Sequence, residues 1–456
     1  MNLEKQDRQE ARATGGRRSL LSLRDIEREA VRFRGCRARR EMLTGEKYYA
    51  GKHDILRRRR MAIGEGGEMQ EISNLPNNRL VDNQYRKLVC QKADYLLGKP
   101  MLLRGISEEY GRQLAEIFGE REQRLLHNAL KRALNQGICY LMPGYDGAGR
   151  FYLRYFNGYE LCPGWRDGAH SAMDYAIRLY TSVEVIDGRE KRRERVEYFD
   201  RGGIWRFTLE GDRLKADEPA YQPYLWLDGR EALWERLPII ALKRDAEETP
   251  LIRCVKGLQD SLNTLISDFQ NAMEEDARNT IMILVNYDGE NLGEFRRNLA
   301  TYGAVKVRSS DGSAGDVRTL QVEVNAENHK AIIDIFRRAI VENGMGVDAR
   351  DERFGNSPNQ MNIRSMYTDL DLDASEMEAE LRGAMRELLW FVNCHLFNLG
   401  RGDFSGEHAQ IALRRSLPVN ESEMIDNIIK SRGLVSDEAL LARHPYAGEQ
   451  ARLSLI

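Results

Sequence analysis

An acidic run near residue 370 carries carboxylates at the spacing of a calcium-binding loop. In DLDLDASEMEAE, Asp369, Asp371, Asp373 and Glu380 occupy positions 1, 3, 5 and 12 of such a loop. Position 6, where the loop needs glycine for its sharp turn, is Ala374, and the run continues a helical pattern of apolar residues. We therefore interpret it as a charged face of a helix and predict no metal site here.

Two other short motifs do not support a chemical role. Cys394 with His395, and the more distant His408, are too few for structural zinc, which takes four ligands, usually in close pairs. The tripeptide RGD at 401–403 is common, and the charged start of the chain shows no secretory signal pattern. The sequence also has no phosphate-cradling glycine loop, zinc-protease helix or nucleophile elbow. We expect no catalytic residue, no metal and no cofactor, and we do not interpret the chain as an enzyme.

Composition and charge narrow the class of protein further. The chain has 456 residues, of which 42% are hydrophobic and 31% charged, and its formal net charge is -2. This length predicts about three domains, and the charge gives no global attraction to nucleic acid. No apolar run approaches the roughly 20 residues of a membrane-spanning helix, so we expect no membrane association. The six cysteines are scattered without a CxxC pair, which indicates reduced thiols in or near the core.

The first half of the chain divides into helical and sheet-forming parts. A very basic stretch at 24–61 has a helical pattern. Apolar residues recur at steps of three and four in 77–100, which predicts one helix, and 107–138 predicts another. From 139 to about 243, short runs rich in Tyr, Val, Ile, Phe and Trp are broken by Gly, Asn and Asp, which predicts a sheet with turns.

The second half is mainly helical. An apolar stripe predicts a helix at 251–278, and 280–324 predicts short strands separated by turns and one short helix. A helix at 326–344 follows, and its last residue, a glycine, is the expected C-cap. A single long helix is predicted from 359 to about 399, and a small helical unit ends the chain.

Between the last two long helices lies a polar loop, GMGVDARDERFGNSPNQM. Its glycines and its Asn-Ser-Pro allow several backbone conformations. On this pattern alone a plain surface connection is a sufficient interpretation. The charged side chains of the loop add to a formal sum of -1: Asp348, Arg350, Asp351, Glu352 and Arg353.

Several stretches resemble the portal proteins of tailed bacteriophages, siphovirus type. The resemblance covers roughly residues 70–450 and keeps the family's order. The matching stretches, in chain order, resemble the early helix, the approach to the stem, the clip, the tunnel loop with its long helix, and the crown: NNRLVDNQYRKLVCQKADYLLGKP, LPIIALKRD, NYDGENLGEFRRNLATYGAVKV, GVDARDERFGNSPNQMNIRSMYTDLDLDASEMEAELR and NESEMIDNIIKSRGLVSDEALLARHP.

The resemblance implies an α+β, multi-domain phage-portal fold with wing, helical stem, small α/β clip, tunnel loop with long helix, and helical crown. The implied boundaries are a flexible N-terminal segment at 1–23, the wing at 24–250, stem helices at 251–279 and 321–343, the clip at 280–320, the tunnel loop at 344–358, the long helix with the rest of the wing at 359–412, and the crown at 413–456.

The resemblance also implies a function. Twelve subunits would form a ring at one capsid vertex, assembled in the bacterial host cytoplasm and retained in the virion. Double-stranded DNA of any sequence would be packaged and ejected through the channel. Terminase and the head-completion or adaptor proteins would dock on the clip, and capsid and scaffolding proteins would also be partners. A channel for any DNA sequence must not grip phosphate, and a ring multiplies each contact, so a nearly neutral or acidic lining suits it.

Under this resemblance the tunnel loop faces DNA and the clip carries the docking surface. The expected DNA-facing residues are Val347, Asp348, Arg350, Asp351, Glu352, Arg353, Phe354 and Asn356. The expected docking residues are Glu294, Arg296 and Arg297.

Two alternatives stay open. A subunit of a nucleic-acid-processing enzyme would need clustered acidic metal ligands, which the sequence does not locate. A generic oligomeric scaffold would form assemblies without contacting DNA.

Overall fold

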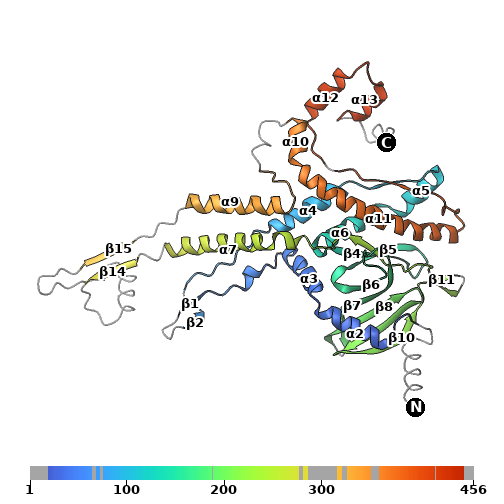
Figure 1. The fold of residues 1–456 in the computed structure, drawn as a ribbon, viewed down its shortest axis with the longest axis horizontal. Coiled ribbons are helices and arrows are strands. Elements are labelled where there is room, and N and C mark those ends of the chain that lie inside the picture. The colour runs from blue at the N-terminus through green and yellow to red at the C-terminus, as the bar shows by residue number, and fades with distance from the viewer. Residues whose placement is uncertain are drawn as a thin grey trace, which may run out of the picture. The chain divides into compact units, whose positions relative to one another are not determined.

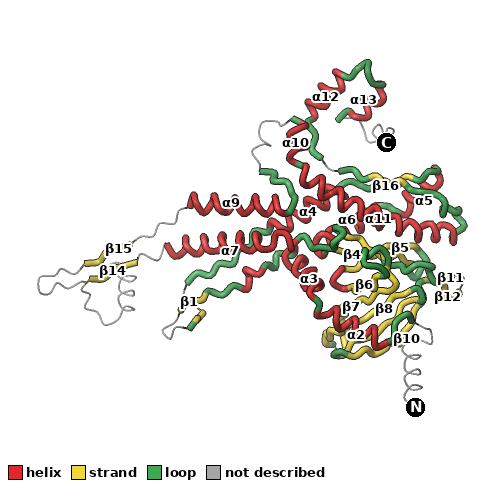
Figure 2. The backbone as a smooth tube through the Cα atoms, in the orientation of Figure 1, coloured by secondary structure: helices red, strands yellow, loops and turns green. Residues whose placement is uncertain are grey.

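The computed structural model describes residues 19–63, 68–71, 75–186, 188–227, 229–276, 281–285, 316–320, 326–350, 359–415 and 417–445. Helices and strands are mixed along these ranges, as the predicted α+β class requires (Figure 1, Figure 2). The chain divides into two compact units. The first unit comprises Met1–Lys52, Asn83–Lys256 and Ile340–Ile456, and the second comprises His53–Asp82 and Gly257–Ala339.

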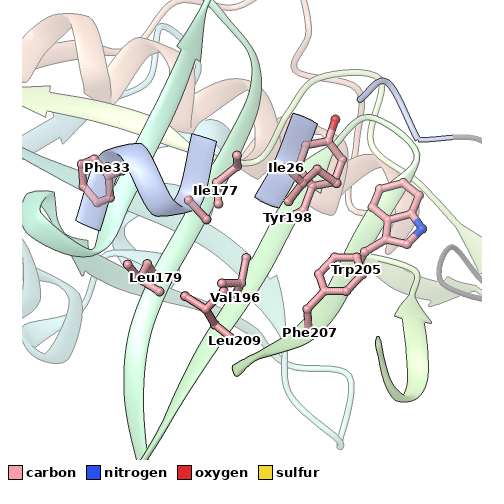
Figure 3. Packing of buried hydrophobic residues seen from close by; sticks show 10 residues of the cluster. Ile26, Phe33, Ile177, Leu179, Val196, Tyr198, Trp205, Phe207 and Leu209 are labelled. Carbon is pink, nitrogen blue, oxygen red and sulfur yellow. The ribbon is translucent and has the colours of Figure 1, made fainter. Parts of the chain in front are cut away.

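The largest sheet of the first unit has five antiparallel strands in the order β10-β9-β8-β7-β6. Its inner face is apolar and is covered by α2 (Leu23–Gly35), whose Ile26, Ala30 and Phe33 are buried there (Figure 3). The opposite face carries ion pairs such as that of Arg178 with Glu197, whose side chains are 19% and 10% exposed. This alternation follows from the two-residue period of a strand. The strands are β6 (Leu161–Trp165), β7 (Met173–Ile186), β8 (Arg189–Asp200), β9 (Gly203–Glu210) and β10 (Arg213–Gln222).

A smaller antiparallel sheet of the first unit has the order β13-β4-β5. β4 is almost wholly buried, and α6 and α11 both pack against this sheet. The predicted sheet region at 139–243 is therefore confirmed, although it forms separate sheets. The strands of this sheet and of two short pairs are β4 (Ile138–Tyr145), β5 (Phe151–Asn157), β13 (Ile240–Lys243), β3 (Leu102–Arg104) with β16 (Gln410–Ala412), and β11 (Leu225–Leu227) with β12 (Arg230–Ala232).

Several helices of the first unit begin at a side chain that accepts a backbone N–H, as an N-cap does. Ser22, Asn83, Ser107 and Asn359 each fill this role. Besides α2, the helices are α3 (Arg37–Tyr49), α4 (Gln84–Leu97), α5 (Glu108–Ile117), α6 (Glu120–Gln136), α10 (Gln360–Met366), α11 (Thr368–Asn398), α12 (Glu421–Lys430) and α13 (Asp437–Arg443), with a 3-10 turn at Gly158–Glu160.

Several predicted continuous helices are interrupted. The stretch at 24–61 breaks at Cys36, which is extended (φ -70°, ψ 155°) and begins α3 with its Sγ as the cap. The stretch at 107–138 breaks at Gly119, and the long helix from 359 breaks at Tyr367. Apolar spacing continues through such breaks, because two successive helices can pack the same core.

The second unit is built around parts of two long helices, α7 (Ile252–Asp276) and α9 (Ala326–Asn343). They run side by side (Figure 1), and the rings of Phe269 and His329 lie 4.9 Å apart. No helix in the described part of the chain is long and apolar enough to cross a membrane. The remaining elements are a 3-10 turn (Asp54–Arg57), the pair β1 (Met61–Ile63) and β2 (Met69–Glu71), and the pair β14 (Ile281–Val285) and β15 (Asp316–Leu320).

A polar ladder on α7 holds an extended segment of the second unit. The backbone N–H groups of Asn78, Leu80 and Asp82 donate to α7 side chains at 2.7, 2.9 and 3.0 Å. Alternate residues of an extended chain repeat every 6.6 Å or so, and four helical residues rise about 6 Å, so the two repeats match. The buried ladder residues are Gln259, Asn263, Ser267 and Asn271.

This ladder explains why the predicted helix at 77–100 begins late. Residues before Asn83 give their backbone N–H groups to α7 instead of to a helix of their own. α4 therefore starts at Gln84, where the side chain of Asn83 accepts the N–H of Arg86.

Candidate functional site: the base of the loop at residues 344–358

The loop begins with a tightly hydrogen-bonded turn. α9 ends at Asn343, and the N–H of Gly344, which follows it, still donates to the oxygen of Ile340 at 3.0 Å. The N–H of Gly346 donates to the oxygen of Val341 at 2.8 Å, and the N–H of Met345 to that of Glu342 at 3.0 Å. These two bonds form a Schellman motif. Its left-handed residue is Met345, at φ 49°, where glycine is usual.

Residues 344–348, which we call the loop base, lie against α4. The side-chain amide of Gln91 donates to the oxygen of Val347 and accepts its N–H, both at 2.9 Å. The ammonium of Lys92 donates to the oxygen of Met345 at 3.0 Å. Two neighbouring side chains of α4 therefore bind the backbone of the loop base at three points.

Close packing adds to these hydrogen bonds. A Cβ atom built on Gly344 or Gly346 would lie 2.5 or 2.4 Å from the side chain of Leu88 on α4. The two glycines therefore permit the close approach of the loop base to α4, and neither has a positive φ. A larger residue at either position would require Leu88 or the loop base to shift.

Lys92 also connects the loop base to α11. Its Nζ lies 2.6 Å from Oδ2 of Asp373, with side-chain exposures of 0% and 6%. One guanidinium nitrogen of Arg244, Nη2, lies 3.4 Å from the other oxygen of Asp373, and the second, Nη1, pairs with Asp245 at 3.2 Å. Burial lowers the pKa of Lys92, and the carboxylate of Asp373 opposes that shift. The two cations are thus balanced by two carboxylates, as buried charges require.

The far side of the loop is tied to the C-terminal helices. Asn359 caps α10 by accepting the N–H of Asn362 at 2.7 Å. The N–H of Gln360 donates to a carboxylate oxygen of Glu423 at 2.6 Å, and its side-chain oxygen accepts the N–H of Asn420 at 2.9 Å. The start of α10 and the start of α12 are therefore held together.

The acidic run has structural partners. Asp369 is exposed, Asp371 accepts from the hydroxyl of Tyr95 at 2.7 Å and pairs with Arg415, and Asp373 pairs with Lys92. On a helix, alternate residues point in different directions, so these carboxylates do not converge. Among the described residues no cluster of three or more His, Cys, Asp or Glu could hold a metal ion.

The other short motifs are also occupied by local contacts. Arg401 of the RGD tripeptide donates to Gln113 at 2.9 Å and pairs with Glu116 at 2.8 Å. His395 packs against the ring of Phe151, with a centroid distance of 5.0 Å, and its Nδ1 lies 3.0 Å from the hydroxyl of Tyr145. Cys254 is exposed, contrary to the expectation that all six cysteines lie in or near the core.

Three of the predicted DNA-facing residues lie in the described part of the loop. Val347 is buried in the chain, at 5% exposure, and its contact with DNA stays a prediction. Asp348 accepts the N–H of Arg350 at 3.0 Å, and the side chain of Arg350 is 52% exposed. The remaining predicted site residues lie outside the described residues: Asp351, Glu352, Arg353, Phe354 and Asn356 in the loop, and Glu294, Arg296 and Arg297 in the predicted clip.

Sequence reasoning missed Gln91, Lys92 and the role of Asp373. A usable pattern was present, because Lys92 lies four residues after Leu88, within the apolar stripe of α4. Asp373 lies three residues after Leu370, within the stripe of α11. Opposite charges inside two apolar stripes indicate a buried ion pair between the two helices.

Comparison with known proteins identifies the class. The family model of phage portal proteins, SPP1 Gp6-like, matches residues 36–452. The chain therefore belongs to the SPP1 Gp6-like family of phage portal proteins, and the resemblance found in the sequence is confirmed.

Curated relatives and solved structures were also found. The chain is 25% identical over 414 residues to the portal protein of Bacillus phage SPP1, covering 89% of this chain and 80% of that protein. It is 25% identical over 423 residues to the portal protein of Clostridium phage phiCD119, covering 90% of each. A chain from the virion of a native gene transfer agent particle aligns with a TM-score of 0.41 and 16% identity, covering 78% of this chain and 88% of that chain. A chain from the neck of that particle, computed with C12 symmetry, aligns with a TM-score of 0.40 and 14% identity over the same shares.

Proposed function

We propose that the chain is the subunit of a portal ring of twelve copies at one vertex of a phage capsid. Double-stranded DNA of any sequence passes through its channel during packaging and ejection. The observation that carries this proposal is the family match over residues 36–452, together with two portal proteins aligned over 89% and 90% of the chain. We assign the chain no catalytic role.

The proposed parts keep the boundaries expected from the sequence. α7 and α9 belong to the stem segments at 251–279 and 321–343, and 280–320 is the clip. The wing comprises 24–250 with 359–412. The remaining parts are the N-terminal segment at 1–23, the tunnel loop at 344–358 and the crown at 413–456.

Exposed apolar side chains support assembly into a ring. Ile332 and Ile335 on α9 are 41% and 63% exposed, and Met361 on α10 and Leu372 on α11 are 79% and 61% exposed. Ile332 and Ile335 are three residues apart on one helix, and neighbouring exposed apolar side chains are typical of interaction sites. Further copies of the chain would cover them in a closed ring, whose interfaces are heterologous.

The charge of the loop supports a channel that does not grip DNA. Its charged residues sum to -1, so a ring of loops would not accumulate phosphate-binding cations. We propose that the loop faces DNA and that the clip, with Glu294, Arg296 and Arg297, receives terminase and then head-completion proteins. Capsid and scaffolding proteins are the expected partners of the ring during assembly in the host cytoplasm, and the ring remains in the virion.

Electron microscopy and light scattering of the purified chain test this function. We expect rings with a central hole wide enough for duplex DNA, and a mass many times 52.5 kDa. A monomer at micromolar concentration argues against the proposal. Magnesium-dependent DNA cleavage that stays with the protein through successive columns supports the enzyme alternative. Closed assemblies without a through-hole support the generic scaffold.

A further inference from the structure

We propose that Gln91 and Lys92 are positioning residues for the loop: they fix the loop base on α4, and Lys92 couples it to α11 through Asp373. The loop base, α4 and α11 then behave as one body when the chain assembles or binds a partner. This positioning role goes beyond the proposed DNA channel. Only the last test below, which measures retained DNA, rests on the proposed function.

The contact of Gln91 with Val347 is directional. One side-chain amide accepts the N–H and donates to the oxygen of the same residue, both at 2.9 Å. A primary amide has the donor and acceptor to do this, as one peptide group does to another in a β-ladder. Two bonds to one residue fix both its position and the direction of its peptide planes. A single bond would leave that residue free to rotate.

The contacts of Lys92 connect two elements that are far apart in the sequence. Its ammonium donates to the oxygen of Met345 at 3.0 Å and to Asp373 at 2.6 Å. An apolar side chain of similar length would fill the same space and avoid the desolvation of a charge. Such an apolar side chain could not form hydrogen bonds to the loop base and to α11 at the same time. Buried ion pairs are weak contributors to stability, so a positioning role accounts better for a lysine here.

Amide hydrogen exchange of the full chain tests the Gln91 contact. In Gln91→Met the volume is kept and both bonds are lost, so we expect exchange at the Val347 N–H to rise about fivefold or more, as loss of an ordinary hydrogen bond gives. Gln91→Glu keeps the acceptor for that N–H, and its exchange should stay near that of the parent chain. Lys87→Met changes an exposed residue of the same helix and is the matched control. It should leave exchange at the Val347 N–H as in the parent chain.

Two outcomes would overturn the Gln91 assignment. One is unchanged exchange at Val347 in Gln91→Met. The other is an equal rise throughout α4, which would mean general destabilisation and no local role.

A double variant tests the coupling to α11. Lys92→Met with Asp373→Leu removes both charges without leaving either alone, so the fold should persist while the bond to Met345 is lost. We expect faster exchange at the Gly346 and Val347 amides than in the parent chain. Unchanged exchange there overturns the coupling.

A second experiment on the same double variant tests function by measuring the DNA that each particle retains. Reduced retention together with altered exchange supports a positioned loop that acts on DNA. Altered exchange with parental retention supports the positioning residues and overturns the DNA-facing role of the loop.

Discussion

Nζ of Lys92 on α4 lies 2.6 Å from Oδ2 of Asp373 on α11, and the two side chains are almost fully buried. These residues are 281 positions apart in the chain. The same ammonium binds the loop base through the oxygen of Met345. The ammonium of Lys92 therefore holds the segment that leaves α9 and the helix α11 together.

Breaking this pair from one side should destabilise the chain strongly. Lys92→Met leaves the buried carboxylate of Asp373 with only Arg244, 3.4 Å away, so we expect a loss of about 3–5 kcal/mol in the free energy of unfolding. The double variant with Asp373→Leu should recover most of that loss. Denaturant unfolding at fixed protein concentration measures both. A single variant as stable as the parent would contradict this account of the pair.

We expect the folded chain to lose stability in mild acid because of His395. Burial, and secondarily the positive charge of Arg401, lowers its pKa in the folded chain below the usual value of about 6.5. The unfolded state then binds the proton more tightly, so the contribution of His395 is complete above about pH 6.5 and is lost as the pH falls toward the folded pKa. Unfolding midpoints measured through this range should show the decline.

The matched variants for this prediction are two histidine substitutions. His395→Phe keeps an aromatic ring beside Phe151 and removes the titrating group, so it should flatten that part of the pH dependence. His408→Phe, at an exposed position, should keep the parental dependence. Equal pH dependence in all three chains would rule out His395 as the source.

The polar ladder of α7 should contribute measurably to stability. Asn263→Ala removes the acceptor of the Asp82 N–H and a partner of His53, so buried polar groups lose their bonds at a cost of about 1–3 kcal/mol. Thr264→Ala, one residue along on the exposed side of α7, should change stability by less than about 0.5 kcal/mol. Thermal or denaturant unfolding compares the two, and similar values would mean that the ladder adds little.

The same ladder shows where sequence reasoning ends. Apolar spacing correctly predicted α7 and α9, because a helix that packs along one face repeats its apolar residues every three or four positions. Met273 continues the apolar stripe of α7, at a step of four from Phe269, yet its side chain is 47% exposed. The buried face there is polar, because its partner is an extended backbone that offers N–H groups and not apolar side chains.

The candidate site shows a similar limit. The loop was correctly placed after α9, but its sequence alone does not show that Val347 is buried. Its backbone is bound by Gln91, 256 residues earlier. A local pattern predicts that a loop exists, whereas a distant side chain decides which of its residues are free to contact a ligand.

Charge reversal in the predicted clip should weaken the docking of partner proteins and leave ring assembly unchanged. Replacing Arg296 and Arg297 with Glu should weaken binding of terminase or a head-completion protein, because acidic surfaces of such a partner would then be repelled. Rings should form as in the parent chain. Pull-down or light scattering with the purified partner measures the effect, and its salt dependence should change with it. Parental binding would remove the assignment of these arginines to the docking surface.

The loop itself should be dispensable for folding but not for function. Deleting 348–353 leaves residues 344–347 on α4, so stability should change little. Rings should assemble, but DNA should not be translocated or retained, because each subunit would lack its contact with DNA.

Replacing Asp348, Asp351 and Glu352 with Lys should act differently from the deletion. The two arginines and three new lysines would give each loop a formal charge of +5, compared with -1 in the parent.

Those added charges should stall DNA by binding its phosphates, and a ring would repeat the contact in every subunit. The stalling should therefore weaken steeply as salt is added, since release of condensed counterions drives such binding. A matched variant that replaces the exposed Glu190, Glu210 and Glu218 with Lys changes the net charge equally, away from the loop. It should package DNA like the parent, which separates a loop effect from one of total charge. DNA content per particle and its dependence on salt during packaging measure these outcomes. If the deletion and the lysine loop both package and retain DNA like the parent, the loop is only a connection between helices.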